Sequence, residues 1–119
     1  MSDRLLLHLQ QIEAAAADAC RFTKGMDQEA FGTDLLVQRA VGMSILMLGE
    51  AAVRIIKENA DFVVDHPEIP WNEISGLRNR IAHGYFTIDL DIIWHTVQVS
   101  LPDLLDKLQA ATHWRAQGE

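Results

Sequence analysis

Residues 35–59 read LLVQRAVGMSILMLGEAAVRIIKEN, and this stretch decides the fold. Its apolar residues recur every three or four positions, which predicts one long helix with Thr33 or Asp34 as its cap. Apolar side chains cover so much of the circumference that this helix must bury more than one face. Gly42 and Gly49 lie two turns apart on one side, where they would let another helix approach closely. We expect a central core helix; the alternative is that part of its surface makes a homodimer.

Helical spacing continues on the N-terminal side of this stretch. Apolar residues three or four apart predict a first helix that starts with Ser2 or Asp3 as its cap. Gly25 is suited to the position just after its C-terminus, because glycine readily adopts the backbone conformation that ends a helix. A short turn at residues 26–32 then leads into the central helix.

Two further helices are predicted on the C-terminal side. The residues HPEIP at positions 66–70 break the chain into a loop, and a third helix follows through residues 78–85. Residues 87–89 cap a fourth helix with a long apolar stripe. Pro102 lies inside this fourth helix, where it removes a backbone donor and should kink the helix near Gln98.

These elements place the chain in the all-α class, as an antiparallel bundle of four to five helices. The length of 119 residues suits one domain that spans residues 1–119. Trp94 and Trp114 are interpreted as core or edge packing rather than as ligand platforms. The bundle is expected to form a homodimer.

Composition bounds the location and the partners. No basic segment followed by an apolar one is readable at the start, and the apolar stretch 41–53 is too short to span a bilayer. The lone Cys20 is interpreted as a small buried thiol in a reducing compartment, so we expect a cytoplasmic protein with no membrane partner. The formal net charge of −7 argues against a surface that binds nucleic acid everywhere, but it permits a local basic site.

The residues RNRIAHGY at positions 78–85 are the segment that can carry chemistry. Each residue of a helix advances about 100°, so Asn79 and His83 share a face and Asn79 is placed to orient the imidazole. Arg78 shares its face with Tyr85 and lies about 140° from His83 by the same geometry. Arg78 and His83 would therefore flank a ligand lying across the helix, or meet partners from a second copy.

An arginine and a histidine are sufficient for RNA cleavage without a metal. Histidine exchanges protons near neutral pH, and the charged fork of arginine suits a phosphate and its transition state. One chain offers one such histidine, whereas a two-fold dimer would offer two, one for each proton transfer. Spacing alone is weak evidence, because Arg78 and Arg80 could equally be solvated charges and His83 a residue at a helix end.

Longer stretches resemble the HepT-like family of the HEPN superfamily, the toxins of HepT–MntA toxin–antitoxin pairs. The resemblance rests on PEIPW at 67–71, ISGLRNRIAHGYFTID at 74–89 and LGEAA at 48–52, with Trp94 and the Leu101-Pro102 pair in the last helix. It covers nearly the whole chain in order. The family motif, Arg-x4-His-x-Tyr with a polar residue after the arginine, is complete as Arg78, Asn79, His83 and Tyr85.

The resemblance implies a specific function. Members dimerise and bring two Arg-x4-His motifs together as a composite, metal-independent ribonuclease site, for which tRNA is one type of target. A minimal nucleotidyltransferase antitoxin, MntA-like, silences the toxin by transferring AMP from ATP to the motif tyrosine, here Tyr85. On this basis His83 transfers protons and Arg78 binds phosphate. Asn79 orients His83 or contacts RNA, and Arg80 contacts the RNA backbone or the antitoxin. The expected system is type VII-like, and no metal or other cofactor is expected.

Three alternatives stay open. Glu50 is expected to pair with Arg54 four residues on, worth about 0.3–0.5 kcal/mol, although it could instead reach across to orient Arg78. The whole chain could be a non-catalytic helical partner of a nucleotidyltransferase. It could also be a helical module in which Arg78 and His83 grip a nucleotide phosphate, but no glycine-rich phosphate loop supports that function.

Overall fold

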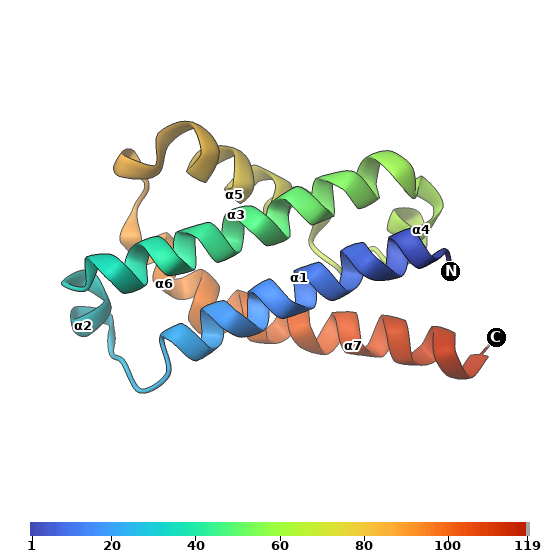
Figure 1. Ribbon diagram of the computed structural model, residues 1–119, viewed down its shortest axis with the longest axis horizontal. Helices are drawn as coiled ribbons and strands as arrows, with labels where there is room; N and C mark the ends of the chain where they lie inside the picture. The colour runs from blue at the N-terminus through green and yellow to red at the C-terminus, as the bar shows by residue number, and fades with distance from the viewer. Residues whose placement is uncertain (119) are drawn as a thin grey trace.

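The computed structural model describes residues 1–118, and for residues 113–118 it describes the backbone alone. The side chain of Trp114, expected to pack at a core or edge, lies outside the described residues. Most of residues 1–118 are helical, short turns and loops join the helices, and no strand occurs among these residues. The expectation of an all-α bundle is therefore confirmed (Figure 1).

The central helix is α3 (Leu35–Glu58), and Asp34 caps it by accepting a hydrogen bond from the backbone N–H of Val37 at 3.0 Å. Helix α1 (Asp3–Phe22) runs antiparallel along one side of α3, and α5 (Trp71–Gly84) runs antiparallel along another (Figure 1). Ser2 caps α1 through its side chain. The long helix predicted from residues 35–59 is thus the central helix, and both α1 and α5 pack against it.

The hydrophobic core lies where α1 and α3 meet the C-terminal helix α7 (Leu101–Gly118). Its largest side chains are almost completely removed from water, which is the main source of stability in a small bundle. Among them are Leu9 and Ile12 of α1, Val41, Ile45, Leu48 and Ile55 of α3, and Leu104 and Leu108 of α7. None of the helices in the described part of the chain has the length and apolar character needed to cross a bilayer.

Two short helices were not predicted from the sequence. The segment expected to be a turn contains α2 (Gln28–Gly32), and α4 (Ala60–Asp65) follows the central helix. Each buries a single phenylalanine; Phe31 of α2 packs on Trp94 with ring centroids 5.3 Å apart. A helix of five or six residues with one buried side chain has no repeating apolar pattern, so periodicity could not reveal it.

The C-terminal helix is interrupted near the expected place. Asp89 caps α6 (Leu90–His95), a π-helical turn η2 (Thr96–Ser100) follows, and α7 begins at Leu101. Pro102 has no N–H to donate to the turn before it, and a π turn is a common way for a helix to absorb such an irregularity. The predicted irregularity near Gln98 is thus a wider turn of helix.

Gly25 ends the first helix with a slightly different geometry from the one predicted. Helix α1 is capped by Thr23, whose N–H donates to the carbonyl of Arg21, so Gly25 is the second residue after the cap rather than the first. Its φ of +81° is the one positive value among the described residues. Glycine adopts this conformation without the steric penalty of a side chain, which lets the chain turn towards α2.

Candidate functional site

Helix α5 lies against α3 at the two glycines singled out in the sequence. A Cβ atom added to Gly49 would lie 2.3 Å from the Cβ of Arg78, and one added to Gly42 would lie 2.5 Å from Cε2 of Tyr85. Gly42 and Gly49 are seven residues apart, and so are Arg78 and Tyr85, in the opposite order along the chain. The two contacts are therefore two points of one antiparallel packing arrangement. The expected close approach of a helix is confirmed, and it seats the first and last residues of the motif.

The guanidinium of Arg78 is held by two neighbours. Its Nε donates to Oε1 of Glu50 at 2.6 Å, its Nη2 forms an ion pair with the same oxygen at 2.5 Å, and its Nη1 donates to Oδ1 of Asn79 at 2.7 Å. The expectation that Glu50 pairs with Arg54 is therefore wrong. Gly49 brings α5 so close to α3 that the carboxylate of Glu50 meets the charge across the helix contact.

Asn79 also has a different partner from the predicted one. Its side-chain oxygen accepts from Arg78, and within residues 1–112 no hydrogen bond joins Asn79 to His83. Adjacent residues of an α-helix point in different directions. The contact between Arg78 and Asn79 therefore requires the long Arg78 side chain to bend towards its neighbour. The structure brings together Arg78, Asn79 and Glu50.

His83 and Arg80 lie on the outer side of α5 and are exposed. Among the described side chains, the His83 ring has no hydrogen-bond partner and Arg80 has no ion pair. A histidine without a partner is free to exchange protons with a bound molecule or to meet a second chain. The arrangement leaves Arg78 on the α3 side and His83 on the solvent side, as the helix geometry predicts.

Tyr85 is half-buried and directly follows α5, in the short helix η1 (Tyr85–Thr87). Its ring lies over Gly42, and its hydroxyl donates to the backbone carbonyl of Gln38 at 2.7 Å. Burial raises the pKa of the Tyr85 phenol, and the positive charge of Arg39 opposes this shift. Tyr85 thus anchors the C-terminal end of α5 to α3 in its neutral form.

Gln38 and Arg39 are the site residues that sequence reasoning missed. Gln38 acts on Tyr85 through a backbone carbonyl, and any residue type could supply that group. Arg39 helps to line a groove of about 300 Å³ between α3 and α5, together with Met43, Ala82 and Tyr85. Arg39 lies three residues before Gly42, on the side of α3 that packs against α5. This position would have indicated Arg39 once Gly42 was known to contact Tyr85.

The described residues contain no group of three or more His, Cys, Asp or Glu side chains suited to a metal ion. Three arginines lie around the motif: Arg78 and Arg80 on α5, and Arg39 beside Tyr85; the carboxylate of Glu50 offsets one of these charges. No acidic residue occurs in the sequence between Glu73 and Asp89. Arginine side chains suit the recognition of phosphate, so this set of charges is compatible with an anion-binding site.

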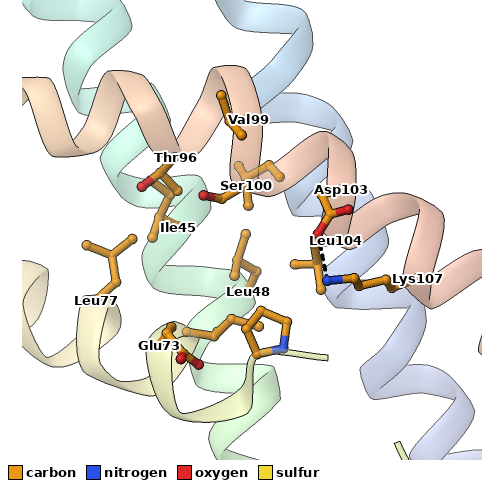
Figure 2. Close-up of a pocket in the computed structure, with 13 residues that line it drawn as sticks. Ile45, Leu48, Glu73, Leu77, Thr96, Val99, Ser100, Asp103, Leu104 and Lys107 are labelled. Atoms are coloured by element: carbon orange, nitrogen blue, oxygen red, sulfur yellow. Dashed lines mark ion pairs between the residues drawn. The ribbon is translucent and has the colours of Figure 1, made fainter. Parts of the chain in front are cut away.

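A separate cavity lies on the other side of α5 from the motif residues. Its volume is about 440 Å³, and its walls come from α3, α5, η2 and α7. Figure 2 shows Leu77 and Glu73 of α5 facing Val99 and Leu104 across it, with the Asp103–Lys107 ion pair of 2.7 Å at its side. None of the motif residues lines this cavity, so it is separate from the candidate site.

Comparisons with known proteins identify the family of the chain. The model of the family described as "Ribonuclease HepT-like" matches residues 12–111. The chain is 34% identical to a probable ribonuclease HepT of Thermococcus cleftensis over 102 residues, covering 86% of this chain and 90% of the relative. It is also 34% identical to a provisionally named RNase of Methanocaldococcus jannaschii over 101 residues, covering 85% and 90%.

A third relative, a provisionally named RNase of Caldanaerobacter subterraneus, is 37% identical over 81 residues, covering 68% of this chain and 70% of the relative. No solved structure matches the chain. The match to the family model includes both glycine contacts, Glu50 and the whole segment 78–85. The chain belongs to the HepT-like ribonuclease family of the HEPN superfamily.

Proposed function

We propose that the protein is a metal-independent ribonuclease toxin that cleaves RNA, with tRNA as a target class, in the cytoplasm. The observation that carries the proposal is the state of the two motif side chains. Arg78 is held against α3 with its charge oriented, and His83, five residues on, is exposed and without a partner. One side chain is prepared to grip a phosphate and the other to exchange a proton.

The proposed reaction is an intramolecular transesterification at a phosphodiester of the RNA. The ribose 2′-oxygen attacks the adjacent phosphorus, a base takes its proton, and the bond from phosphorus to the 5′-oxygen breaks as an acid protonates that oxygen. Arg78 stabilises the extra negative charge that develops on the phosphate oxygens. A histidine can take either proton-transfer role because its charge changes near neutral pH.

A second copy of the chain would supply the second histidine. On α3, the side chains of Leu36, Met43 and Met47 are 80%, 56% and 56% exposed. By helix geometry they form one apolar stripe, and Glu50 lies at its edge on the side of α5. An exposed apolar stripe is typical of a protein–protein contact. We propose that it joins two copies and brings their Arg78–His83 motifs to one cleft.

We further propose that a minimal nucleotidyltransferase antitoxin, MntA-like, silences the toxin by modifying Tyr85. In that step the phenol oxygen attacks the α-phosphorus of ATP, pyrophosphate leaves, and the phenol proton is released. Tyr85 is the only tyrosine in the sequence, and it shares the α3 contact with Arg78. The adenylate would bring a negative charge and a bulky group next to the phosphate site, where it would repel and block RNA.

Expression of the protein alone in bacterial cells tests the toxin function. We expect growth arrest by the wild type, and its loss in Arg78→Ala and His83→Ala. Arg4→Ala is a matched control, because Arg4 is an exposed arginine paired with Glu58 at 2.8 Å on another part of the bundle. Growth arrest that persists in both motif variants would contradict the assignment of the site.

A further inference from the structure

We infer that Glu50 is a positioning residue for Arg78: its carboxylate and the Asn79 amide oxygen hold the guanidinium so that one pair of N–H groups faces a phosphate. This inference rests on the proposed function, because it concerns how the phosphate-binding arginine is prepared. Nothing in the motif Arg-x4-His-x-Tyr includes Glu50, which comes from α3. The assignment therefore extends the site from α5 to the central helix.

The argument starts from the donors of the guanidinium. Arg78 has five N–H groups: one on Nε and two on each terminal nitrogen. Glu50 accepts from Nε and is ion-paired with Nη2 through the same oxygen, and Asn79 accepts from Nη1. At least one N–H on each of the terminal nitrogens Nη1 and Nη2 is left. These terminal nitrogens form the fork that binds two oxygens of one phosphate, so the two neighbours occupy the donors that such a phosphate does not need.

The stem of the side chain is restrained as well. The Cβ and Cγ atoms of Arg78 lie where a side chain at position 49 would be, and the Arg78 side chain is 25% exposed. A long flexible side chain loses conformational freedom when it binds a ligand, and less is lost when it is already held. The Gly49 contact and the Glu50 ion pair together hold Arg78 before RNA arrives.

Glu50 has a second, opposing effect on RNA. Its carboxylate is negative and 49% exposed, so it repels a phosphate that approaches Arg78. Position and charge can therefore be separated by substitution. A glutamine keeps an oxygen that accepts from Nε but has no charge, whereas an alanine removes both the acceptor and the charge.

The test measures initial rates of total tRNA cleavage against tRNA concentration. We expect Glu50→Ala to lower kcat by about 10- to 100-fold, because a misplaced catalytic group loses rate on this scale. Glu50→Gln should keep kcat within about three-fold of the wild type and should lower KM, because the repulsion is gone. Glu58→Ala is the matched control. Glu58 lies on α3, as Glu50 does, and pairs with Arg4 of α1, so its loss should leave kcat and KM unchanged.

A measurement without RNA keeps the inference testable if cleavage is absent. The exchange of the Arg78 Nε proton with water, followed by NMR, should be slow in the wild type and in Glu50→Gln. The exchange should be fast in Glu50→Ala. Equal exchange in all three proteins would mean that Glu50 does not hold Arg78, whatever the protein does to RNA.

The outcomes of the two proposals differ. Wild-type kcat in Glu50→Ala, together with an inactive Arg78→Ala, would overturn the role of Glu50 and leave the ribonuclease site standing. A Glu50→Gln variant as slow as Glu50→Ala would also overturn it, because the charge rather than the hydrogen bonds would then matter. Full activity in Arg78→Ala would instead overturn the proposed function itself.

Discussion

Helix α3 has two buried faces that are built differently. The core face carries large apolar side chains such as Val41, Leu48 and Ile55, which are at most 2% exposed. The face towards α5 carries Gly42 and Gly49, against which Tyr85 and Arg78 pack. The core face removes apolar surface from water. The glycine face lets the side chains of Arg78 and Tyr85 lie close to the backbone of α3. Stability and site geometry are therefore carried by different sides of one helix and should respond to different mutations.

The largest effect on stability is expected on the core face. Ile55→Ala removes a completely buried side chain and leaves a cavity, so it should lower the free energy of unfolding by about 2–5 kcal/mol. Denaturant titration measures this loss. The RNA cleavage of the folded fraction should stay at the wild-type level. Strong loss of cleavage in molecules that remain folded would show that the two faces are not independent.

A smaller loss of stability and a larger loss of function are expected from Gly49→Ala. The new Cβ would lie 2.3 Å from the Cβ of Arg78 and 3.5 Å from its Cα, so α5 must move. Overpacking of this kind destabilises by about 1–3 kcal/mol. Unfolding and tRNA cleavage would be measured on the same samples, and cleavage should fall because Arg78 is displaced from Glu50.

Gly76→Ala is the matched control for Gly49→Ala. Gly76 lies inside α5, and a Cβ there meets nothing within 4 Å. Alanine is favoured over glycine within a helix, so this variant should be more stable by about 0.5–1 kcal/mol. A Gly49→Ala variant that is as stable and as active as Gly76→Ala would contradict the close contact at Gly49.

Tyr85→Phe tests the other end of the same face. The ring still covers Gly42, but the hydrogen bond to the Gln38 carbonyl is lost, so stability should fall by about 0.5–1.5 kcal/mol. Cleavage should be retained, and the proposed acceptor for AMP, the Tyr85 hydroxyl, would be gone. Thermal unfolding and intact mass after incubation with ATP and the nucleotidyltransferase check both points. Addition of AMP to the phenylalanine variant would place the modification at another residue.

The smallest effect is a pH dependence at alkaline pH. Burial raises the pKa of the Tyr85 phenol in the folded state, so the folded protein holds this proton more tightly than the unfolded chain. The associated stability is fully present below the pKa of the unfolded chain, about 10, and is lost as pH rises through the pKa of the folded state. Because Tyr85 is the only tyrosine, tyrosinate absorbance reports it alone. A midpoint in the native protein at or below that of the denatured chain would contradict the burial of this hydroxyl.

Repeating patterns explain what could be predicted from the sequence. The long helices are set by apolar periodicity and by capping residues such as Ser2, Asp34 and Asp89, all of which cap helices in the structure. The glycine pair on α3 predicted a close helix contact, and α5 makes it. Helices α2 and α4 were missed because their stability comes from single buried aromatic side chains.

The contacts of the candidate site depend on tertiary structure. Glu50 has a basic residue four positions on, which made Arg54 the expected partner; its actual partner, Arg78, is 28 positions away. The Gln38 carbonyl that binds Tyr85 has no sequence signature at all. The motif residues Arg78, Asn79, His83 and Tyr85 were identified as a set from the resemblance, but how α3 holds two of them follows only from the fold.

Cleavage of total tRNA in excess EDTA tests the central claim most directly. The protein would be purified without partners, checked by intact mass, and compared with His83→Ala. The account predicts cleavage by the unmodified wild type and none by the variant. No cleavage by a wild type of unmodified mass would contradict the ribonuclease function and favour a non-catalytic partner of a nucleotidyltransferase, whereas cleavage by both proteins would contradict the role of His83.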